Sequence, residues 1–593
     1  MSYQAPLKDM QFVIEHLAGL ANVQKLPGFA DYDADTAQAV LEESAKFCQD
    51  VLSPLNWSGD QQPSTWNQGE VKASPGFKEA LQQYAEGGWQ GITHPVEYGG
   101  QGFPKLIATG CNEMLQASNL SFALCPLLTD GAIEALMTAA SEDQKQKYVP
   151  RMISGEWTGT MNLTEPQAGS DLAAVRTRAE PQADGTYKIF GTKIYITWGE
   201  HDMTDNIIHL VLARLPDAPA GVKGISLFVV PKFLVQNDGS LGARNDVQCV
   251  SIEHKLGIKA SATAVLQFGD NGGAVGELLG EPNRGLEYMF IMMNAARFGV
   301  GIQGVAVADR AYQQAVAYAK DRVQSRDVAG SASPVSIIHH PDVKRMLLTI
   351  KAQTEAARAV AYVGAAHSDV AHFSDDEQAR QSSLAIYEYL VPVIKGHSTE
   401  LSVDSTSLGV QVHGGMGFIE ETGAAQHFRD SRILPIYEGT TAIQANDFVG
   451  RKTLRDQGKV AKLICSQIAQ TEQDLAAHAD ADCVAMKESL QTGRLALERV
   501  IDFLLHNAKG DPRVIYSAAV PYLRLAGVVL GGWQMARALM MAQSMRADDP
   551  AFYDGKIVTC NFYAAAILPQ AQAYADAACL SASAINQMDL EWF

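Results

Sequence analysis

The stretch Met161–Asp171, MNLTEPQAGSD, stands where the hydrophobic period of the chain changes from helical spacing to alternation. Its threonine, Glu-Pro pair, glycine and Ser-Asp pair form a turn-rich loop. Such a loop presents backbone N–H groups and hydroxyls, which suit a polar ring edge or a phosphate. A tight surface turn before a strand has the same composition, so both interpretations stand for this stretch alone.

Before this loop the spacing of apolar residues is mostly helical. Thr36–Leu52 and Leu106–Leu136 carry apolar residues three and four positions apart. The segment His94–Lys105, HPVEYGGQGFPK, has the proline and glycine content of a loop between them. We therefore predict an N-terminal helical domain over residues 1–157.

After the loop the period becomes two. Four runs are rich in β-branched and aromatic residues: Tyr187–Thr197, Asn206–Ala213, Gly224–Val230 and Thr263–Phe268. Turn-forming clusters separate them, as in an antiparallel barrel or sandwich. We predict a middle β domain over residues 158–281.

Long helical segments then return, and they predict a bundle over residues 282–455. They are Met289–Arg322, Asp342–His367 and Glu377–Lys395. A further Ala-rich helical domain is expected over residues 456–593. The fold class is thus mainly α with a central β domain.

Composition excludes several classes of protein. The chain has 593 residues, with 47 basic and 66 acidic side chains and a net charge of −19. That field repels phosphate backbones and anionic lipid, so nucleic acid and membrane surfaces are not expected partners. Its 47% hydrophobic and 19% charged residues are typical of a globular protein of several domains.

Cysteine usage and the start of the chain point to the cytoplasm. None of the eight cysteines lies in a CxxC pair, so we expect reduced, mostly buried thiols and no metal site. No secretory signal pattern opens the sequence. No run of about 18 apolar residues is visible, which argues against integral membrane contact.

Two further motifs are ambiguous in isolation. Tyr195–Gly199, YITWG, ends a predicted strand and could face a planar cofactor, although an ordinary turn explains it as well. Gln411–Phe418, QVHGGMGF, has adjacent glycines that let a backbone approach a ligand closely, but a plain turn does too. It is not a GxGxxG after a strand, so the Rossmann fingerprint is absent.

The segment Tyr437–Thr441, YEGTT, follows an apolar stretch. A desolvated carboxylate at Glu438 would have a pKa raised toward that of a general base. The competing interpretation is an exposed glutamate at the capping region of a helix.

Together and in this order, these motifs resemble the acyl-CoA dehydrogenase family over about residues 40–452. MNLTEPQAGSD is similar to the family's TEPxAGSD signature, and YEGTTAIQ to its YEGT catalytic segment. The resemblance implies an N-terminal helical domain, a middle β-barrel or sandwich, and a four-helix bundle. It implies non-covalent FAD and the α,β-dehydrogenation of an acyl-CoA to the trans-2-enoyl-CoA, with hydride transfer to flavin N5.

The resemblance also implies the FAD contacts. Leu163 and Thr164 would meet the flavin edge, and Tyr195, Ile196 and Thr197 would flank the ring. Arg322 would pair with the pyrophosphate of a neighbouring subunit, as its planar fork allows. The remaining FAD contacts implied are Ser170, Gln411, Gly414, Gly415, Thr440 and Gln444.

Glu438 matches the family's catalytic base, which removes the α-proton. Some members carry the base just before an arginine that matches Arg297, but here that preceding residue is Ala296, which has no carboxylate. Ser170, Arg297, Tyr437 and Gly439 are the implied substrate contacts. Arg297 either lines the cleft, anchors the Glu438 loop or makes a purely structural ion pair.

Two departures from the family stand out. Trp198 replaces a residue that is often small or polar, which would change the mouth of the acyl pocket. About 140 residues also follow the family core, as in very-long-chain enzymes and in a bacterial branch. Motif spacing favours the bacterial branch, which resembles 3-methylmercaptopropionyl-CoA dehydrogenases and medium/long-chain acyl-CoA dehydrogenases.

The expected partners are an acyl-CoA, an electron-transferring flavoprotein and at least a second copy of the chain. An acyl-CoA oxidase that uses oxygen is the rival enzyme. A non-catalytic acyl-CoA-binding or DNA-binding member is the rival of another class. The intact Glu438 argues against a scaffold, and the acidic charge argues against a DNA binder. The sequence does not determine the acyl chain length.

Overall fold

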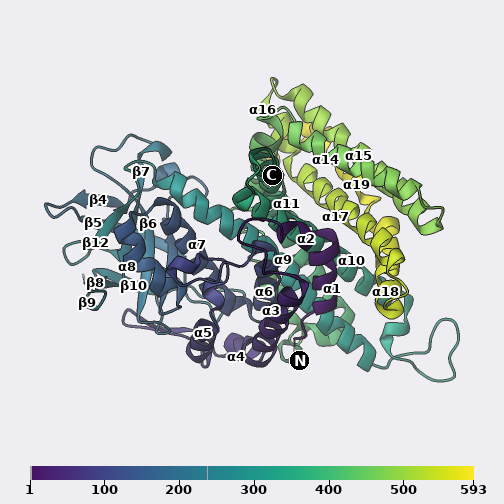
Figure 1. Cartoon of the computed structure of the whole chain (residues 1–593), viewed down its shortest axis with the longest axis horizontal. Coiled ribbons are helices and arrows are strands. Elements are labelled where there is room, and N and C mark those ends of the chain that lie inside the picture. The colour runs from purple at the N-terminus through teal and green to yellow at the C-terminus, as the bar shows by residue number, and fades with distance from the viewer. Residues whose placement is uncertain (1–2, 237) are drawn as a thin grey trace.

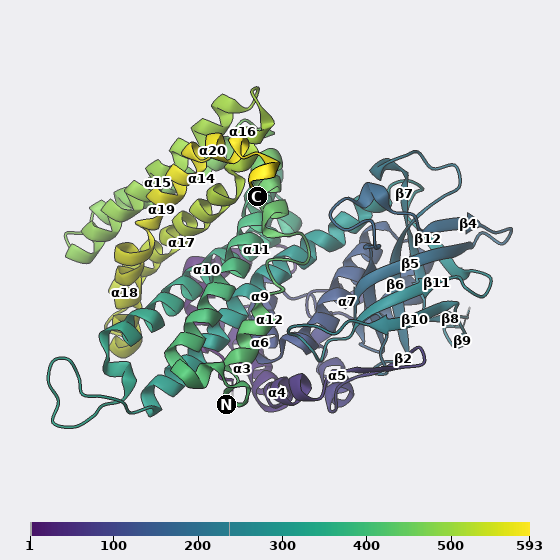
Figure 2. The same ribbon diagram turned by 180° about the vertical axis from the view of Figure 1, so that it is seen from behind.

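The computed structural model describes residues 3–236 and 238–593, which form a helical body with a β domain at one end (Figure 1). The turned view shows that the C-terminal helices lie along the side of the central bundle (Figure 2). The predicted order of helices, β domain, bundle and further helices is confirmed.

The N-terminal helical region ends at Ile153. Its helices are α1 Leu7–Phe12, α2 Leu20–Val23, α3 Ala34–Phe47, α4 Ser53–Gln61, α5 Phe77–Glu86, α6 Lys105–Ser118, α7 Leu120–Ala139 and α8 Glu142–Ile153, and its hairpin is β1 Thr65–Asn67 with β2 Glu70–Lys72. The predicted segment Leu106–Leu136 is in fact two helices. Asn119 separates them because its side chain accepts a hydrogen bond from the Phe122 N–H and caps α7.

The β domain contains one eight-stranded sheet in the order β10-β11-β5-β12-β7-β6-β3. Its strands are β3 Trp157–Asn162, β4 Arg178–Pro181, β5 Tyr187–Thr197, β6 Asn206–Arg214, β7 Ile225–Pro231, β10 Val247–Ile252, β11 Thr263–Phe268 and β12 Ala274–Leu279, with β8 Phe233–Val235 and β9 Leu241–Arg244 as a separate hairpin. β4 pairs with both β5 and β6 and closes a barrel-like ring. Purely antiparallel pairing was wrong, because β6 runs parallel to β3 and to β4.

The central bundle is built on α9 Gly285–Asp321, α10 Pro341–Phe373 and α11 Glu377–His413, which pack along one another. α11 runs well past the predicted end at Lys395 and contains Pro392. Two shorter helices, α12 Ala424–Ser431 and α13 Thr441–Val449, pack on α11. Loop 432–440 joins them and carries the YEGTT motif.

The extra C-terminal helices form a domain that packs on α10 and α11. They are α14 Lys459–Ala476, α15 Ala481–Asn507, α16 Pro512–Ser517, α17 Ala519–Ser544, α18 Pro550–Phe562, α19 Gln570–Leu580 and α20 Ala582–Gln587. The N-terminal segment packs against this domain as well. The Phe12 ring lies 6.1 Å from that of Phe552, and Arg537 donates to the Leu17 carbonyl at 2.8 Å.

Three helices are long and apolar enough to cross a membrane by length and composition: α7, α9 and α17. None of them is a continuous apolar run, because polar or charged residues interrupt each helix, such as Asp130 in α7, Arg297 in α9 and Arg524 in α17. Most of each apolar window is buried inside the protein, at 78%, 67% and 78%. All eight cysteines are free and only Cys579 is not fully buried, as predicted.

Candidate functional site

Glu438 lies in a strained turn between α12 and α13. Its φ is +54° and that of Gly439 is +87°, so two consecutive residues have left-handed backbone. A non-glycine residue there costs free energy and persists only where its surroundings hold it. Position 439 requires glycine, because an added Cβ would lie 2.6 Å from Gln444 Nε2.

Two buried side chains hold this turn through its carbonyl groups. Gln444 on α13 donates from Nε2 to the carbonyls of Glu438 at 3.2 Å and Gly439 at 3.4 Å. Lys395 on α11 donates from Nζ to the carbonyls of Gly439 at 2.7 Å and Leu434 at 2.9 Å. Both side chains are fully buried, and the Gln444 Oε1 has no partner among the described residues.

The electrostatics of the turn suit a general base. Burial raises the pKa of the Glu438 carboxyl above its ordinary value, and the positive charges of Arg297 and Lys395 oppose that rise. Burial lowers the pKa of Lys395 to about 7, although the negative charge of Glu438 favours the charged form of the lysine. The charges of Arg297 and Lys395 therefore both favour the ionised form of the Glu438 carboxyl.

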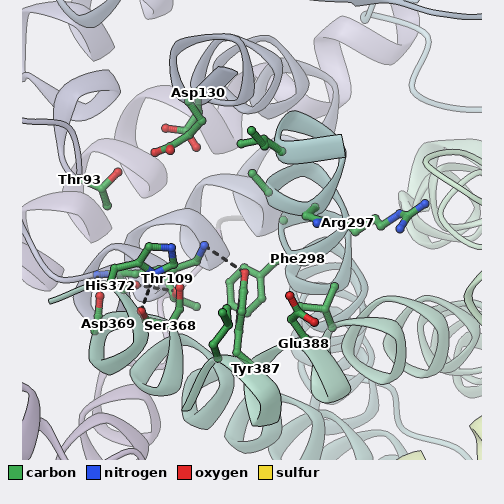
Figure 3. A pocket seen from close by; sticks show the side chains of 18 of the residues that line it. Thr93, Thr109, Asp130, Arg297, Phe298, Ser368, Asp369, His372, Tyr387 and Glu388 are labelled. Atoms are coloured by element: carbon green, nitrogen blue, oxygen red, sulfur yellow. Dashed lines mark hydrogen bonds between the residues drawn. The ribbon is translucent and has the colours of Figure 1, made fainter. Parts of the chain in front are cut away.

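Arg297 on α9 is 4% exposed and has few partners. Its nearest carboxylate is Asp447 on α13, at 3.8 Å, and its Nε has no hydrogen-bond partner among the described residues. It also lines a cavity of about 1420 Å³ between the N-terminal helices and the bundle. Figure 3 shows Thr93 and Asp130 on one wall of that cavity and Phe298 and Tyr387 on another.

Two of the predicted flavin-contacting segments lie side by side. Leu163 and Thr164 follow the end of β3, and the Thr164 carbonyl accepts from the Ile194 N–H on β5 at 2.9 Å. On β5, Ile196 is 2% exposed and Tyr195 is 60% exposed at φ +60°. The hydroxyls of Thr164 and Thr197 are half-buried donors of the kind that a flavin edge needs.

An ion pair that the sequence analysis missed supports this loop. Glu165 Oε1 and Lys193 Nζ are 2.9 Å apart, and both side chains are buried. Despite burial, Lys193 and hydrogen bonds from Thr177 and the Arg176 N–H lower the pKa of Glu165 to about 2. Lys193 also donates to the Leu163 carbonyl at 2.9 Å, so it fixes the loop at the predicted flavin contacts Leu163 and Thr164.

A second predicted group lies at another end of the molecule. Arg322 caps the C-terminus of α9, and Gln411, Gly414 and Gly415 lie at the end of α11. The stacked rings of Tyr318 and His413, 4.4 Å apart, join these two helix ends. Arg322, Gln411 and both glycines are exposed, and an added Cβ at either glycine would meet nothing within 4 Å. Such an open surface fits the approach of a phosphate or an adenosine group.

The structure separates this second group from the flavin-edge group. The connection between α9 and α10 begins at Arg322 and projects from the end of the molecule opposite the β domain in both views (Figures 1 and 2). One chain therefore does not bring the two sets of predicted FAD contacts together.

The remaining predicted residues have identified surroundings. Tyr437 donates its hydroxyl hydrogen to Gln303, and Thr440 accepts from the Ile443 N–H and caps α13. Ser170 is exposed in its loop. Trp198 is 1% exposed and donates to the Ser121 carbonyl at 3.1 Å, so it packs in the core rather than at a pocket mouth.

Comparisons with known proteins agree with this architecture. Four domain models match in succession: "Acyl-CoA dehydrogenase, N-terminal domain" (residues 34–156), "Acyl-CoA dehydrogenase, middle domain" (160–271), "Acyl-CoA dehydrogenase, C-terminal domain" (283–454) and "Acetyl-CoA dehydrogenase C-terminal like" (464–589).

Two curated relatives match over nearly their whole lengths. The 3-methylmercaptopropionyl-CoA dehydrogenase of Ruegeria pomeroyi is 50% identical over 97% of both chains. A butyryl-CoA dehydrogenase of Syntrophomonas wolfei is 34% identical over 96% of this chain and 95% of its own. Among solved structures, an acyl-CoA dehydrogenase from Bacillus anthracis complexed with FAD has the same fold, with a TM-score of 0.73 at 22% identity over 94% of this chain and 90% of its own.

The chain belongs to the acyl-CoA dehydrogenase family. It is an FAD-dependent oxidoreductase, and the extra C-terminal helices are a domain that full-length relatives share. The half-buried hydroxyls beside β3 and β5 and the open glycine surface on α11 fit the FAD that this family uses.

Proposed function

We propose that the protein oxidises an acyl-CoA thioester to the trans-2-enoyl-CoA with Glu438 as the base. The observation that carries this proposal is the strained, half-buried Glu438 turn, where desolvation raises the carboxyl pKa and the charges of Arg297 and Lys395 oppose that rise. A raised carboxyl pKa lies closer to the operating pH and makes a better proton acceptor. The YEGT resemblance supports the same assignment.

In the proposed reaction the Glu438 carboxylate accepts the α-proton, and the electrons of that C–H bond enter the new carbon–carbon double bond. Bound FAD supplies the acceptor for the hydride that leaves the β-carbon. The Glu438 N–H donates to the thioester oxygen, where negative charge develops. Gly439 and Gln444 keep that N–H and the carboxylate on the same strained turn.

For FAD we propose the contacts predicted from the sequence. Leu163, Thr164, Tyr195, Ile196 and Thr197 would hold the flavin. Arg322, Gln411, Gly414 and Gly415 would hold the pyrophosphate and adenosine of FAD bound to a second subunit. Arg297, Tyr437, Gly439 and Ser170 remain the proposed substrate contacts, and Thr440 and Gln444 the proposed FAD contacts next to the base.

As substrate we propose a short, unbranched acyl group of the size of butyryl or 3-methylmercaptopropionyl. The full-length relatives of those names support this size. The cavity beside Arg297 has an apolar wall that includes Leu127, Phe290 and Phe298, which suits an aliphatic chain, and its link to the base turn is Arg297, since no residue of loop 432–440 lines it. Its volume of about 1420 Å³ exceeds what a short chain fills, so longer chains belong in the test.

The test is a panel of acyl-CoAs, from butyryl to palmitoyl and including 3-methylmercaptopropionyl, mixed anaerobically with the FAD-loaded protein. We expect flavin bleaching to be fastest with the short thioesters. Equal bleaching across the panel would contradict the substrate size, and no bleaching with any thioester would contradict the reaction itself.

We propose that an electron-transferring flavoprotein takes the electrons, as in the family. The reduced protein should reoxidise quickly with that flavoprotein and slowly in air-saturated buffer. Rapid oxygen consumption in its absence would favour the acyl-CoA oxidase alternative. A cytoplasmic location, in keeping with the free cysteines, is part of the proposal.

We further expect a homodimer or a larger homo-oligomer. Exposed apolar side chains surround the second group of predicted FAD contacts: Val323 (54%), Val328 (79%), Met416 (47%), Phe418 (87%) and Ile419 (44%). Clusters of this kind mark protein contacts. Light scattering should show at least two chains, and Phe418→Ser should weaken both association and FAD retention. A wild-type monomer that retains FAD would contradict the cross-subunit contact.

A further inference from the structure

The resemblance assigns no role to Lys395, yet this lysine, like Gln444 of α13, donates hydrogen bonds into loop 432–440 from outside it. It lies on α11, four residues before Thr399, and its side chain is fully buried. Its two acceptors, the carbonyls of Leu434 and Gly439, are at the two ends of the segment that contains Tyr437 and Glu438. One ammonium thus joins both ends of the strained segment.

The local backbone explains why such a contact is needed. Glu438 at φ +54° and Gly439 at φ +87° leave carbonyl groups that helix α13 does not take up. A buried carbonyl without a donor destabilises the folded state, because it has lost its hydrogen bond to water. Lys395 and Gln444 satisfy these carbonyls, and the resulting hydrogen bonds hold the turn in the conformation that presents the carboxylate.

The charges around Lys395 come from several elements. Glu438 on the loop and Glu400 on α11 favour its charged form, and Arg297 on α9 opposes it. Glu400 is itself paired with Arg524 of α17 at 3.1 Å, and Arg297 faces Asp447 of α13 at 3.8 Å. Glu438 has no ion-pair partner of its own within the described residues. Of the two carboxylates near Lys395, Glu400 is thus paired with an arginine and Glu438 is not.

We propose that Lys395 is a positioning residue of the dehydrogenation reaction. Its ammonium fixes the strained Glu438–Gly439 turn by hydrogen bonding to the carbonyls of Gly439 and Leu434, and its positive charge favours the carboxylate form of Glu438 that accepts the α-proton. This inference rests on Glu438 being the base. Lys395 touches neither substrate nor the reacting atoms in this account and acts only through the turn.

The experiment compares Lys395→Met, Lys395→Gln and Lys395→Arg with the wild-type protein, each loaded with FAD. Anaerobic stopped-flow traces at saturating butyryl-CoA report the rate of flavin reduction, and its concentration dependence reports binding. For Lys395→Met we expect flavin reduction to slow by about tenfold to a hundredfold with little change in binding, as for a misplaced catalytic group.

The pH dependence separates positioning from a merely structural role. An opposite charge nearby lowers a carboxyl pKa, so its loss in Lys395→Met and Lys395→Gln should move the acidic limb of the rate profile upward by about one pH unit. Lys395→Arg keeps the charge and should leave the limb near its wild-type position, even if the different geometry slows the reaction. An acidic limb that does not move in Lys395→Met would overturn the proposal.

A measurement without FAD tests whether the hydrogen bonds of Lys395 hold loop 432–440 in place. Amide hydrogen exchange of the peptide that covers residues 434–441 should become faster in Lys395→Met, while peptides from α17 keep their protection. An unchanged exchange rate in residues 434–441 would show that Lys395 does not hold the turn. Lys556→Met is the matched control, because Lys556 is a buried lysine that is 3% exposed and far along the chain, on α18. It should lower stability without shifting the rate profile.

If Lys395→Met does not fold, Lys395→Gln carries the test, because its amide can still donate to one carbonyl without the charge. Failure of the base assignment has a different signature. In that case Glu438→Gln would retain flavin reduction, and the acidic limb of the wild-type profile would persist in that variant.

Discussion

Glu438→Gln is expected to bind FAD and acyl-CoA but to reduce its flavin about 10²–10⁴-fold more slowly than the wild-type protein, the usual contribution of a positioned general base. Glutamine is nearly isosteric with glutamate, so the strained turn and the N–H of residue 438 should survive. What is lost is the group that accepts the α-proton. Ala296 supplies no second carboxylate at the position that some relatives use.

The measurement is the rate of flavin bleaching in an anaerobic stopped-flow instrument. Glu421→Gln is the matched control, since Glu421 is an exposed glutamate in the short turn before α12. It should bleach at the wild-type rate. A Glu438→Gln protein that bleaches within about tenfold of the wild-type rate would show that Glu438 is not the base, because even the low end of general-base catalysis exceeds that.

The same substitution makes a prediction about pH. Burial raises the pKa of Glu438, so the wild-type rate should fall as the pH drops through that raised value, above the ordinary carboxyl range of about 4.3. In the folded protein the carboxyl binds its proton more tightly than in the unfolded chain. Stability is therefore lost as the pH rises through the interval between the two pKa values. Glu438→Gln should melt higher than wild type at neutral pH, and the difference should shrink on acidification.

Local composition was enough for two strands that are rich in β-branched and aromatic residues. The predicted bounds Tyr187–Thr197 and Thr263–Phe268 are those of β5 and β11. β3 was not among the predicted runs, and all six of its residues are buried although its sequence, WTGTMN, alternates between apolar and polar residues. α11 was predicted to end at Lys395, whereas the helix includes Pro392 and continues for eighteen more residues to His413 within the bundle.

The candidate site was predictable only as far as motifs extend. The YEGTT motif marked Glu438, but nothing local linked it to Lys395, whose acceptors are 39 and 44 positions away. The Glu165–Lys193 pair joins a motif residue to a strand residue 28 positions on, and only the folded sheet brings them together. Contacts of this kind come from tertiary packing, which one sequence does not display.

The largest stability effect is expected from Arg358→Met. Arg358 on α10 is 1% exposed, and its guanidinium binds three buried carboxylates: Asp9 on α1 at 2.6 Å, Glu113 on α6 at 2.6 Å and Asp309 on α9 at 3.1 Å. Removing one partner of a buried ion pair costs about 3–5 kcal/mol, because the opposite charge is left uncompensated. Here three carboxylates lose their shared cation, so the midpoint of urea unfolding should fall strongly.

Those carboxylates also determine how the loss depends on pH. Burial raises the pKa of Glu113 and Asp309 even with Arg358 present. Without Arg358 both should hold protons more tightly still in the folded state, so the variant should lose stability as the pH rises and recover part of it on acidification. Unfolding midpoints at pH 5.5 and pH 8 check this.

Arg345→Met is the control on the same helix, since Arg345 pairs with Asp342 at an exposed site and its loss should change the unfolding midpoint little. Because Asp9 also binds Lys556 of α18, loss of Arg358 should loosen the C-terminal domain together with the bundle. An Arg358→Met protein that unfolds at the wild-type midpoint at pH 8 would mean that apolar packing alone joins these regions.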